Sequence, residues 1–178
     1  MTAPKLNHTA VVVLGLVAAG DRNGWEITQT VNKSTRYFWA ASRGGIYPEF
    51  KKLEAAGLLL SASDPRGDVA RHSYTITPEG EQALASWLSS DQPGRFDMRH
   101  EDLLRLFFAD DLEPERQVAL LRRIRAVHER QIDDLEQISR PAGGVPSRLL
   151  TLEYGLALHR AAAQWCLDVE NRLMPSAT

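Results

Sequence analysis

Apolar positions follow a helical period from the start of the chain. Residues 10–19 are a nearly unbroken apolar run, which predicts a helix over about 6–19 that is buried on more than one side. Asn7 and Thr9 are candidate N-caps of this helix, and Gly20 is a candidate stop.

A turn and a second helix come next. The segment Asp21-Arg-Asn-Gly24 predicts a turn in which the Asn-Gly pair adopts positive φ. A helix over about 25–33 follows, and it directs one set of side chains inward, namely Trp25, Ile27 or Thr28, and Val31.

A third helix is predicted over about 42–56, and its two faces differ. Ser42 is a good N-cap, and Gly57 ends the helix. Apolar side chains form the inner stripe, at Ile46, Phe50 and Leu53. The opposite face carries polar and basic side chains, at Arg43, Tyr47, Lys51 and Lys52.

The period then changes from that of a helix to that of a strand. Two short runs, 58–63 and 69–77, flank a Pro/Gly turn at 64–68 and predict an antiparallel hairpin with Tyr74 and Ile76 on one side.

A fourth helix begins at Pro78, with Thr77 as its N-cap. Its predicted buried stripe consists of Ala83, Leu84, Trp87 and Leu88. Three helices followed by a two-stranded hairpin is the order of a winged helix-turn-helix. In that fold the third helix enters the DNA major groove and the hairpin reaches the neighbouring backbone or minor groove.

The second half of the chain is predicted to be helical. Residues 89–95 form the best linker, and helices follow at about 97–109, 114–138 and 147–173. The first of them is too apolar to be exposed, since it carries Leu103, Leu104, Leu106, Phe107 and Phe108. The fold class is therefore mainly α, with a winged helix-turn-helix domain at 1–90 and a helical dimerisation domain at 91–178 that can also take an effector.

The last helix has two apolar stripes. One follows near-heptad spacing and consists of Leu149, Leu152, Leu156, His159, Ala163, Cys166 and Leu173. The other consists of Leu150, Tyr154, Leu158, Ala161, Trp165 and Val169. A terminal helix with two apolar stripes needs a partner on each, so we expect a dimer and place its interface on the first stripe; an intramolecular bundle can bury the same stripes.

Charge is distributed unevenly along the chain. The total of −2 and the 25% of charged residues are ordinary for a soluble globular protein. Residues 1–78, however, hold nine Lys and Arg against six Asp and Glu, a net of +3, whereas residues 79–178 have a net of −5. This division favours a basic N-terminal module that meets a polyanion, although such charges can also be a solvated surface.

Several motifs in a fixed order resemble the PadR family of bacterial transcription regulators. They are Gly24-Trp-Glu-Ile in the second helix, Gly44-Gly-Ile-Tyr-Pro-Glu-Phe-Lys-Lys-Leu-Glu-Ala-Ala-Gly-Leu in the third, and Arg71-His-Ser-Tyr-Thr-Ile-Thr-Pro-Glu-Gly at the closing strand. The match covers residues 10–90, and it departs from the usual pattern at Trp25 and Phe50, where tyrosine and leucine are usual.

This resemblance implies that Tyr47 faces DNA from the recognition helix; the alternative is that Tyr47 packs against the wing. Gly44 lets the helix start approach the phosphates, and Pro48 falls in about the first helical turn. The predicted DNA-binding residues are Lys33, Arg36, Ser42, Arg43, Gly44, Tyr47, Pro48, Lys51, Lys52, Arg66 and Arg71.

Other chemistry finds little support in the sequence. One cysteine excludes an intramolecular disulfide, and His159 with Cys166 is at most half a metal site, so we expect no metal and no cofactor. Phosphate-loop and Ser/His/Asp signatures are absent, which argues against an enzyme. The run 10–19 is too short to span a membrane and has a single preceding lysine, so we expect a cytoplasmic protein with no membrane partner.

The sequence thus predicts a dimeric, sequence-specific transcription regulator, a repressor, that binds double-stranded DNA at a two-fold operator. The rival is a module that uses its winged helix to hold a partner protein. The resemblance also implies response to a small aromatic or amphipathic effector. Aromatic side chains can line such a site where the modules meet or can form core; they are Phe38, Trp39, Trp87, Phe96, Phe107, Phe108 and Trp165.

Overall fold

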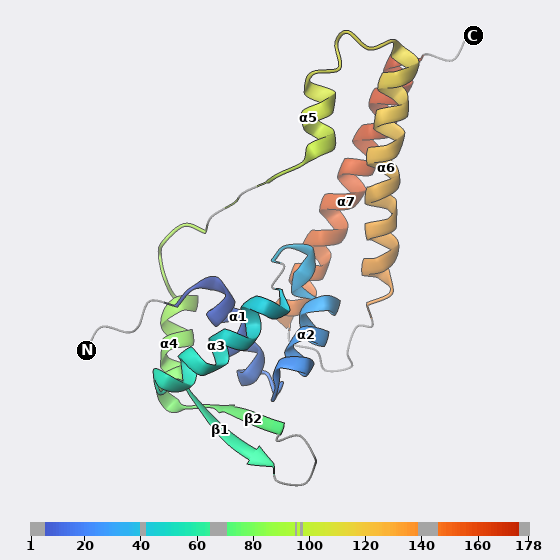
Figure 1. Ribbon diagram of the computed structural model, residues 1–178. Coiled ribbons are helices and arrows are strands. Elements are labelled where there is room, and N and C mark those ends of the chain that lie inside the picture. The colour runs from blue at the N-terminus through green and yellow to red at the C-terminus, as the bar shows by residue number, and fades with distance from the viewer. Residues whose placement is uncertain are drawn as a thin grey trace. The chain divides into compact units, whose positions relative to one another are not determined.

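The computed structural model describes residues 6–39, 42–64, 71–94, 96, 98–138 and 146–174. The chain forms two compact units, Met1–Gly94 and Arg95–Thr178. Figure 1 shows helices and one small hairpin in the first unit and only helices in the described part of the second. The mainly helical fold class expected from the sequence is confirmed.

Two capped helices open the first unit. α1 (His8–Ala18) begins at Asn7, whose side chain accepts a hydrogen bond from the Ala10 amide. α2 (Gly24–Lys33) begins at Asn23, whose side chain accepts from the amides of residues 25 and 26. The expected Asn-Gly turn is therefore wrong. Asn23 has φ −150° and acts as an N-cap, because the same short polar side chain that favours turns can satisfy free amides at a helix start.

The third helix, α3 (Arg43–Ala55), follows a short 3₁₀ turn, η1 (Thr35–Tyr37). Its start is capped by the Ser42 side chain, as expected. Its end turns at Gly57, which has φ +71°, and the amide of Leu58 returns to the Leu53 carbonyl oxygen at 2.8 Å. A left-handed glycine followed by this bond is a Schellman ending, and it directs the chain into the hairpin.

The hairpin pairs β1 (Leu59–Asp64) with β2 (Arg71–Ile76) in antiparallel register, from Leu59 opposite Ile76 to Asp64 opposite Arg71. The expected side-chain alternation is confirmed, because Tyr74 and Ile76 both pack against the core. That core is formed mainly by side chains from α1, α2, α3 and β1, with Val13, Leu14, Ile27, Ile46 and Leu59 fully enclosed. Burial of apolar area of this kind is the main source of stability for the unit.

α4 (Pro78–Leu88) closes the first unit, and Thr77 caps it. A Cβ at Gly80 would collide with the carbonyl oxygen of Leu58, so this glycine lets the helix lie directly on the start of the hairpin. The inward stripe predicted for α4 is only half right. Ala83 is buried, but Trp87 and Leu88 are exposed, as is Trp25 on α2.

The second unit contains α5 (Glu101–Phe107), α6 (Pro114–Glu136) and α7 (Pro146–Leu173). α5 begins four residues later than the predicted start at residue 97, because His100 provides its cap by accepting from the Leu103 amide. α6 and α7 pack side by side (Figure 1). Ion pairs link them, joining Arg122 and Arg125 to Glu170, and Arg160 to Glu136.

The first apolar stripe of α7 faces α6 of the same chain. Leu156 and Cys166 are buried there, and Cys166 shares a small core with Leu120, Leu121 and Ile124 of α6. Two of the seven residues that the sequence suggested for a dimer interface, Leu156 and Cys166, are therefore buried within one chain, as in the intramolecular alternative that the pattern left open. Both stripes have a helical period, and period alone does not choose between the two partners.

Large apolar side chains remain exposed in the second unit. On α7 they are Leu150, Tyr154, Leu158, Trp165 and Leu167, and on or beside α5 they are Leu104, Phe107 and Phe108. The expectation that the α5 side chains are too apolar to be exposed is wrong for these three in the single chain. The seven aromatic side chains considered for core or pocket are between 37% and 81% exposed, so none of them belongs to a core.

Among the described residues, none of the helices has both the length and the hydropathy needed to cross a bilayer.

Candidate DNA-binding surface

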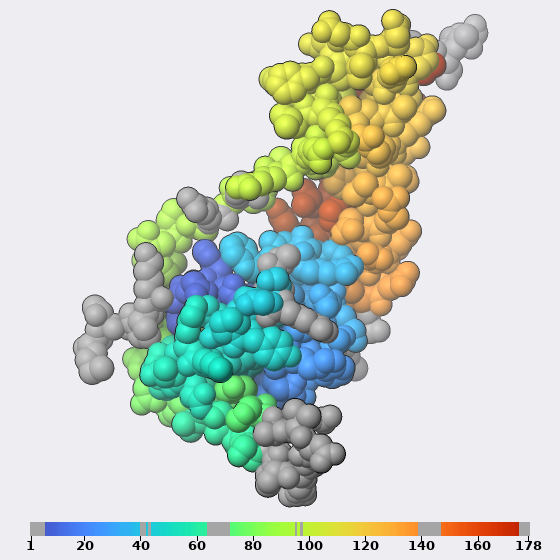
Figure 2. All heavy atoms as spheres, in the orientation of Figure 1, coloured from blue at the N-terminus to red at the C-terminus, as the bar shows by residue number. Residues whose placement is uncertain are grey.

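One face of α3 points away from the core and is open to solvent. Gly44, Tyr47, Pro48 and Lys51 are exposed and lie at positions i, i+3, i+4 and i+7, which places them on one side of the helix. The opposite side holds the buried Ile46, Phe50 and Leu53, as predicted. Figure 2 shows α3, in cyan to teal, on the face of the first unit that is turned toward the viewer.

The first turns of α3 differ from the expectation at one position. Ser42 accepts from the Gly45 amide at 3.2 Å, so the helix begins at Arg43. Pro48 is then an interior residue of the helix and not part of its first turn. A proline inside a helix removes the donor to the carbonyl four residues earlier, and here that carbonyl belongs to Gly44. Arg43 starts the helix, and its side chain lies outside the described set.

A buried carboxylate ties α3 to α1. Glu49 is 6% exposed and accepts from the Asn7 side chain at 3.1 Å and from the Lys52 ammonium at 2.8 Å. Burial raises the pKa of Glu49, but the Lys52 and Asn7 hydrogen bonds outweigh it and hold the pKa below its ordinary value. The carboxylate is therefore charged at neutral pH, and Lys52, one of the three lysines predicted to bind DNA, is already paired with it.

The Tyr47 side chain lies over the start of α2. A Cβ built on Gly24 would be 2.7 Å from both Cε1 and Cζ of the Tyr47 ring. The ring thus rests directly on the glycine backbone, and 53% of the tyrosine remains exposed. The alternative expected from the sequence was contact with the wing; the ring contact observed here is with α2.

The other predicted residues are spread over three elements. Lys33 ends α2 and is exposed, and Arg36 lies in η1 with its guanidinium 4.8 Å from the centre of the Tyr37 ring. Arg71 is the first residue of β2, but its side chain is outside the described set, and Arg66 lies outside the described residues altogether. Of the predicted residues, the structure brings Tyr47, Pro48 and Lys51 together on α3.

Two residues that support this surface were missed by sequence reasoning. Asn7 was expected only as a helix cap, yet it also binds Glu49, 42 residues away. Gly24 was expected in a turn and as the first residue of the Gly24-Trp-Glu-Ile motif, yet it also supports Tyr47. The sequence held one signal for the hydrogen bond between Asn7 and Glu49, which was the acidic Glu49 within an otherwise apolar stripe.

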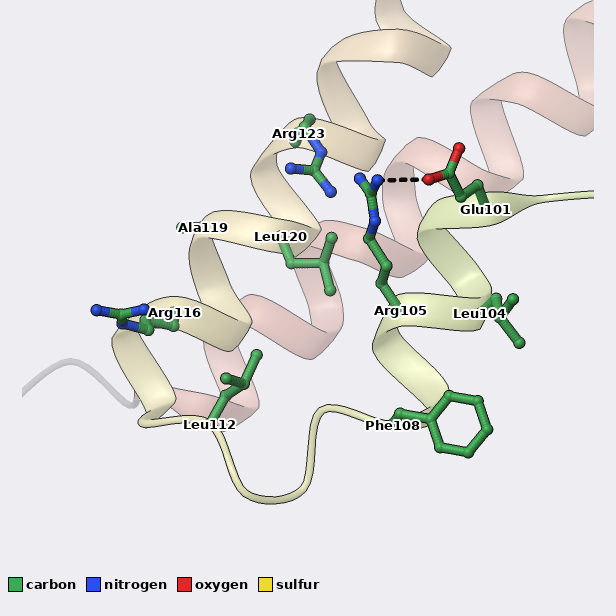
Figure 3. Close-up of a pocket in the computed structure, with 9 residues that line it drawn as sticks. All are labelled: Glu101, Leu104, Arg105, Phe108, Leu112, Arg116, Ala119, Leu120 and Arg123. Carbon is green, nitrogen blue, oxygen red and sulfur yellow. Dashed lines mark hydrogen bonds and ion pairs between the residues drawn. The ribbon is translucent and has the colours of Figure 1, made fainter.

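A shallow hollow lies on the second unit between α5 and α6 (Figure 3). Its volume is about 790 Å³, and Leu104, Phe108, Leu112 and Leu120 give it an apolar lining. Arg105, Arg116 and Arg123 also line it, and Arg105 pairs with Glu101. Within the described residues, no three His, Cys, Asp or Glu side chains are grouped so that they could hold a metal ion.

Comparison with known families divides the chain in the same way as its fold. Residues 13–86 match the family described as "Transcriptional regulator PadR-like family". Residues 98–174 match the family described as "Virulence activator alpha C-term".

The chain is also similar to individual proteins and solved structures. Over 97 residues, or 54% of its length, this chain is 33% identical to the negative transcriptional regulator PadR of Bacillus subtilis (strain 168); the chain spans about half the length of that curated relative, 53%. The crystal structure of B. subtilis PadR in complex with operator DNA superimposes with a TM-score of 0.84 at 23% identity, covering 94% of this chain and 100% of that one. The structure of the same regulator with p-coumaric acid gives a TM-score of 0.75 at 23% identity, covering 95% and 98%.

Proposed function

Because this chain belongs to the PadR-like family of transcriptional regulators, we propose that it is a dimeric, sequence-specific DNA-binding repressor. The outward face of α3 is the observation that carries the proposal, since it presents Tyr47, Pro48 and Lys51 to solvent from the third helix of a winged helix-turn-helix. A regulator of this kind is not an enzyme, and it acts in the cytoplasm, where the DNA of a bacterium is.

The proposed DNA contacts fall into two groups. Tyr47 and Arg43 on α3 enter the major groove, where a phenol or a guanidinium can reach base edges. Charged and polar groups around them bind phosphate, namely Lys33, Arg36, Ser42, Gly44, Lys51, Lys52, Arg66 and Arg71. Pro48 keeps the exposed face of α3 free of a long side chain. Lys52 contributes less than Lys51, because its ammonium is paired with Glu49 at 2.8 Å.

Dimerisation is assigned to the exposed stripe of α7. Leu150, Tyr154 and Leu158 follow one side of the helix and are at least half exposed in the single chain. The sequence expectation used the other stripe, whose members Leu156 and Cys166 are already buried against α6. Burial of the exposed stripe against a second copy removes apolar area from water and gives two recognition helices for a two-fold operator.

Release of DNA by a small aromatic or amphipathic ligand is part of the proposal. The related B. subtilis PadR has been crystallised with p-coumaric acid, which is such a molecule. A ligand that prefers one spacing of the two recognition helices would shift the dimer toward that spacing and change its DNA affinity.

The test is a binding titration across a salt series. The probe is a duplex enriched from a random-sequence pool on the wild-type protein, with poly(dI-dC) as the non-specific competitor. DNA recognition predicts a steep negative slope of log affinity against log salt and a strong preference for the enriched duplex. A flat slope with no preference would instead favour the protein-interaction module. Arg43→Ala must weaken binding to the enriched duplex; unchanged affinity removes Arg43 from the contact set.

A further inference from the structure

We propose that Gly24 is a positioning residue for DNA recognition, which acts by holding the Tyr47 ring in its binding orientation. This inference rests on the proposed function, since it concerns how α3 reads DNA. The observation is the close approach of α2 and α3, where no Cβ fits between residue 24 and the Tyr47 ring.

The backbone does not require glycine at this position. Among the described residues, the only positive φ values belong to Gly20 and Gly57, so Gly24 has a conformation open to every residue type. It is also the first residue of α2, where alanine has a higher helix propensity than glycine. The backbone conformation therefore does not explain the glycine. The Tyr47 ring does, because it occupies the space that a Cβ at residue 24 would need.

The start of α2 is held firmly from several sides. Asn23 accepts from the amides of residues 25 and 26 at 3.1 and 3.0 Å, and its own amide group donates to Glu26 at 2.8 Å. The Thr28 hydroxyl donates to the Gly24 carbonyl at 2.6 Å. The amide of Tyr74 in β2 donates to the Arg22 carbonyl at 2.8 Å. A substitution at residue 24 will therefore move the half-exposed tyrosine before it moves the backbone.

The shift that Gly24→Ala requires of the Tyr47 ring is larger than the range of donor–acceptor distances that a hydrogen bond allows. A Cβ lies 2.7 Å from ring atoms Cε1 and Cζ, whereas carbon atoms in contact are about 3.5–4.0 Å apart. The ring must shift by about 0.8 Å or more, and the hydroxyl beyond Cζ moves with it. An O–H···O bond spans only about 2.5–3.0 Å, so a phenol placed for one acceptor would lose that bond.

The experiment compares Gly24→Ala, Tyr47→Ala and the double variant in the full-length chain. Urea unfolding measures stability, and affinity is measured for the duplex enriched on the wild-type protein and for poly(dI-dC). Gly24→Ala is expected to keep the wild-type unfolding midpoint or raise it, because alanine favours the helix and the ring can yield. Its affinity for the enriched duplex should fall about tenfold, as for loss of one specific contact, while binding to poly(dI-dC) stays unchanged.

The double variant separates positioning from any independent effect. If Gly24 acts through Tyr47, adding Gly24→Ala to Tyr47→Ala lowers the affinity no further. If the double variant loses affinity by the product of the two single losses, the inference is overturned. It is also overturned if Gly24→Ala binds the enriched duplex as tightly as the wild type. Either result leaves the proposed function intact, because the wild type would still bind its duplex with a steep salt dependence. Absence of wild-type DNA binding would instead be the failure of the proposed function.

Discussion

His128 on α6 and His159 on α7 share a hydrogen bond, with their Nδ1 atoms 2.9 Å apart. One of these atoms must carry a proton and the other a lone pair, so the bond is lost once both rings are doubly protonated. His100, the cap of α5, has its ring centre 6.0 Å from that of His128. Three elements of the second unit therefore meet at a cluster that tolerates little positive charge.

Stability of the second unit should fall as the pH drops below about 6.5. Burial lowers the pKa of both His128 and His159, and the charges on His159 and His100 lower the pKa of His128 further. The unfolded chain then binds protons that the folded chain does not, so the contribution is complete above the unfolded pKa and is lost as pH falls through the folded values.

Urea unfolding at several pH values between 7.5 and 5 checks this expectation. A His128→Gln/His159→Gln variant keeps polar side chains and should flatten the pH dependence in that window. Glu49 and Asp102 also have lowered pKa values, but the stability that these carboxylates contribute is lost only below about pH 4.5. An equally steep pH dependence in the double variant would show that other groups are responsible.

If two copies of the chain associate through the exposed stripe of α7, a charge introduced into this stripe should dissociate the dimer. Leu158 is 50% exposed in the single chain, so Leu158→Asp removes little intramolecular packing. Light scattering should report a monomer, with the helical circular dichroism of the wild type. Asn171→Asp is the matched control, because it adds the same charge to an exposed position of α7 outside the stripe. A dimer that survives Leu158→Asp would move the interface to another surface, such as the exposed side chains beside α5.

The sequence was sufficient where the signal was local. Ser42 and Thr77 were recognised as N-caps because a short polar side chain at a helix start has one dominant use. Gly57 was recognised as a helix end for the same kind of reason. Asn23 shows the limit, since asparagine before glycine suits both a turn and a cap, and only the packed structure selects the cap.

Long-range partners were beyond the reach of the sequence. The two stripes of α7 have the same period, and only the packing of α6 shows that Leu156 and Cys166 face inward. Trp87 and Leu88 continue the period of a buried stripe but extend past the core of their unit. Gly24 and Tyr47 are in contact because residue 24 has no side chain. The pattern of apolar residues along the chain does not indicate such a contact.

Asn7 is expected to contribute to stability in two ways. Its side-chain oxygen accepts from the Ala10 amide at 2.8 Å, and its nitrogen donates to Glu49 at 3.1 Å. Asn7→Ala removes a cap, which costs about 0.5–2 kcal/mol, and leaves the buried Glu49 with one partner fewer, so we expect a total of about 1–3 kcal/mol. Urea unfolding measures it. Ser61→Ala, which removes an exposed hydrogen bond to Glu54, should change stability far less.

Tyr47 and Lys51 should affect DNA binding in different ways, although both are exposed on α3. Tyr47→Ala should weaken binding to the enriched duplex by about 1–3 kcal/mol and leave non-specific binding nearly unchanged. Competition with poly(dI-dC) gives both values. An equal loss on both kinds of DNA would assign Tyr47 to the phosphate backbone.

The neighbouring lysines Lys51 and Lys52 offer the sharpest test of how α3 meets phosphate. Both are exposed and lie next to each other, but Lys52 is paired with Glu49 at 2.8 Å, whereas no carboxylate within the described part of the chain pairs with Lys51. Lys51→Ala should weaken binding to all sequences alike and reduce the salt slope by about 0.9 for the lost phosphate contact. Lys52→Ala should change the slope less, because the Glu49 carboxylate already neutralises its ammonium in the free protein. The slopes come from titrations of each variant at several salt concentrations. Equal effects of the two substitutions would mean that Lys52 leaves Glu49 when DNA binds, so that the buried carboxylate then depends on Asn7.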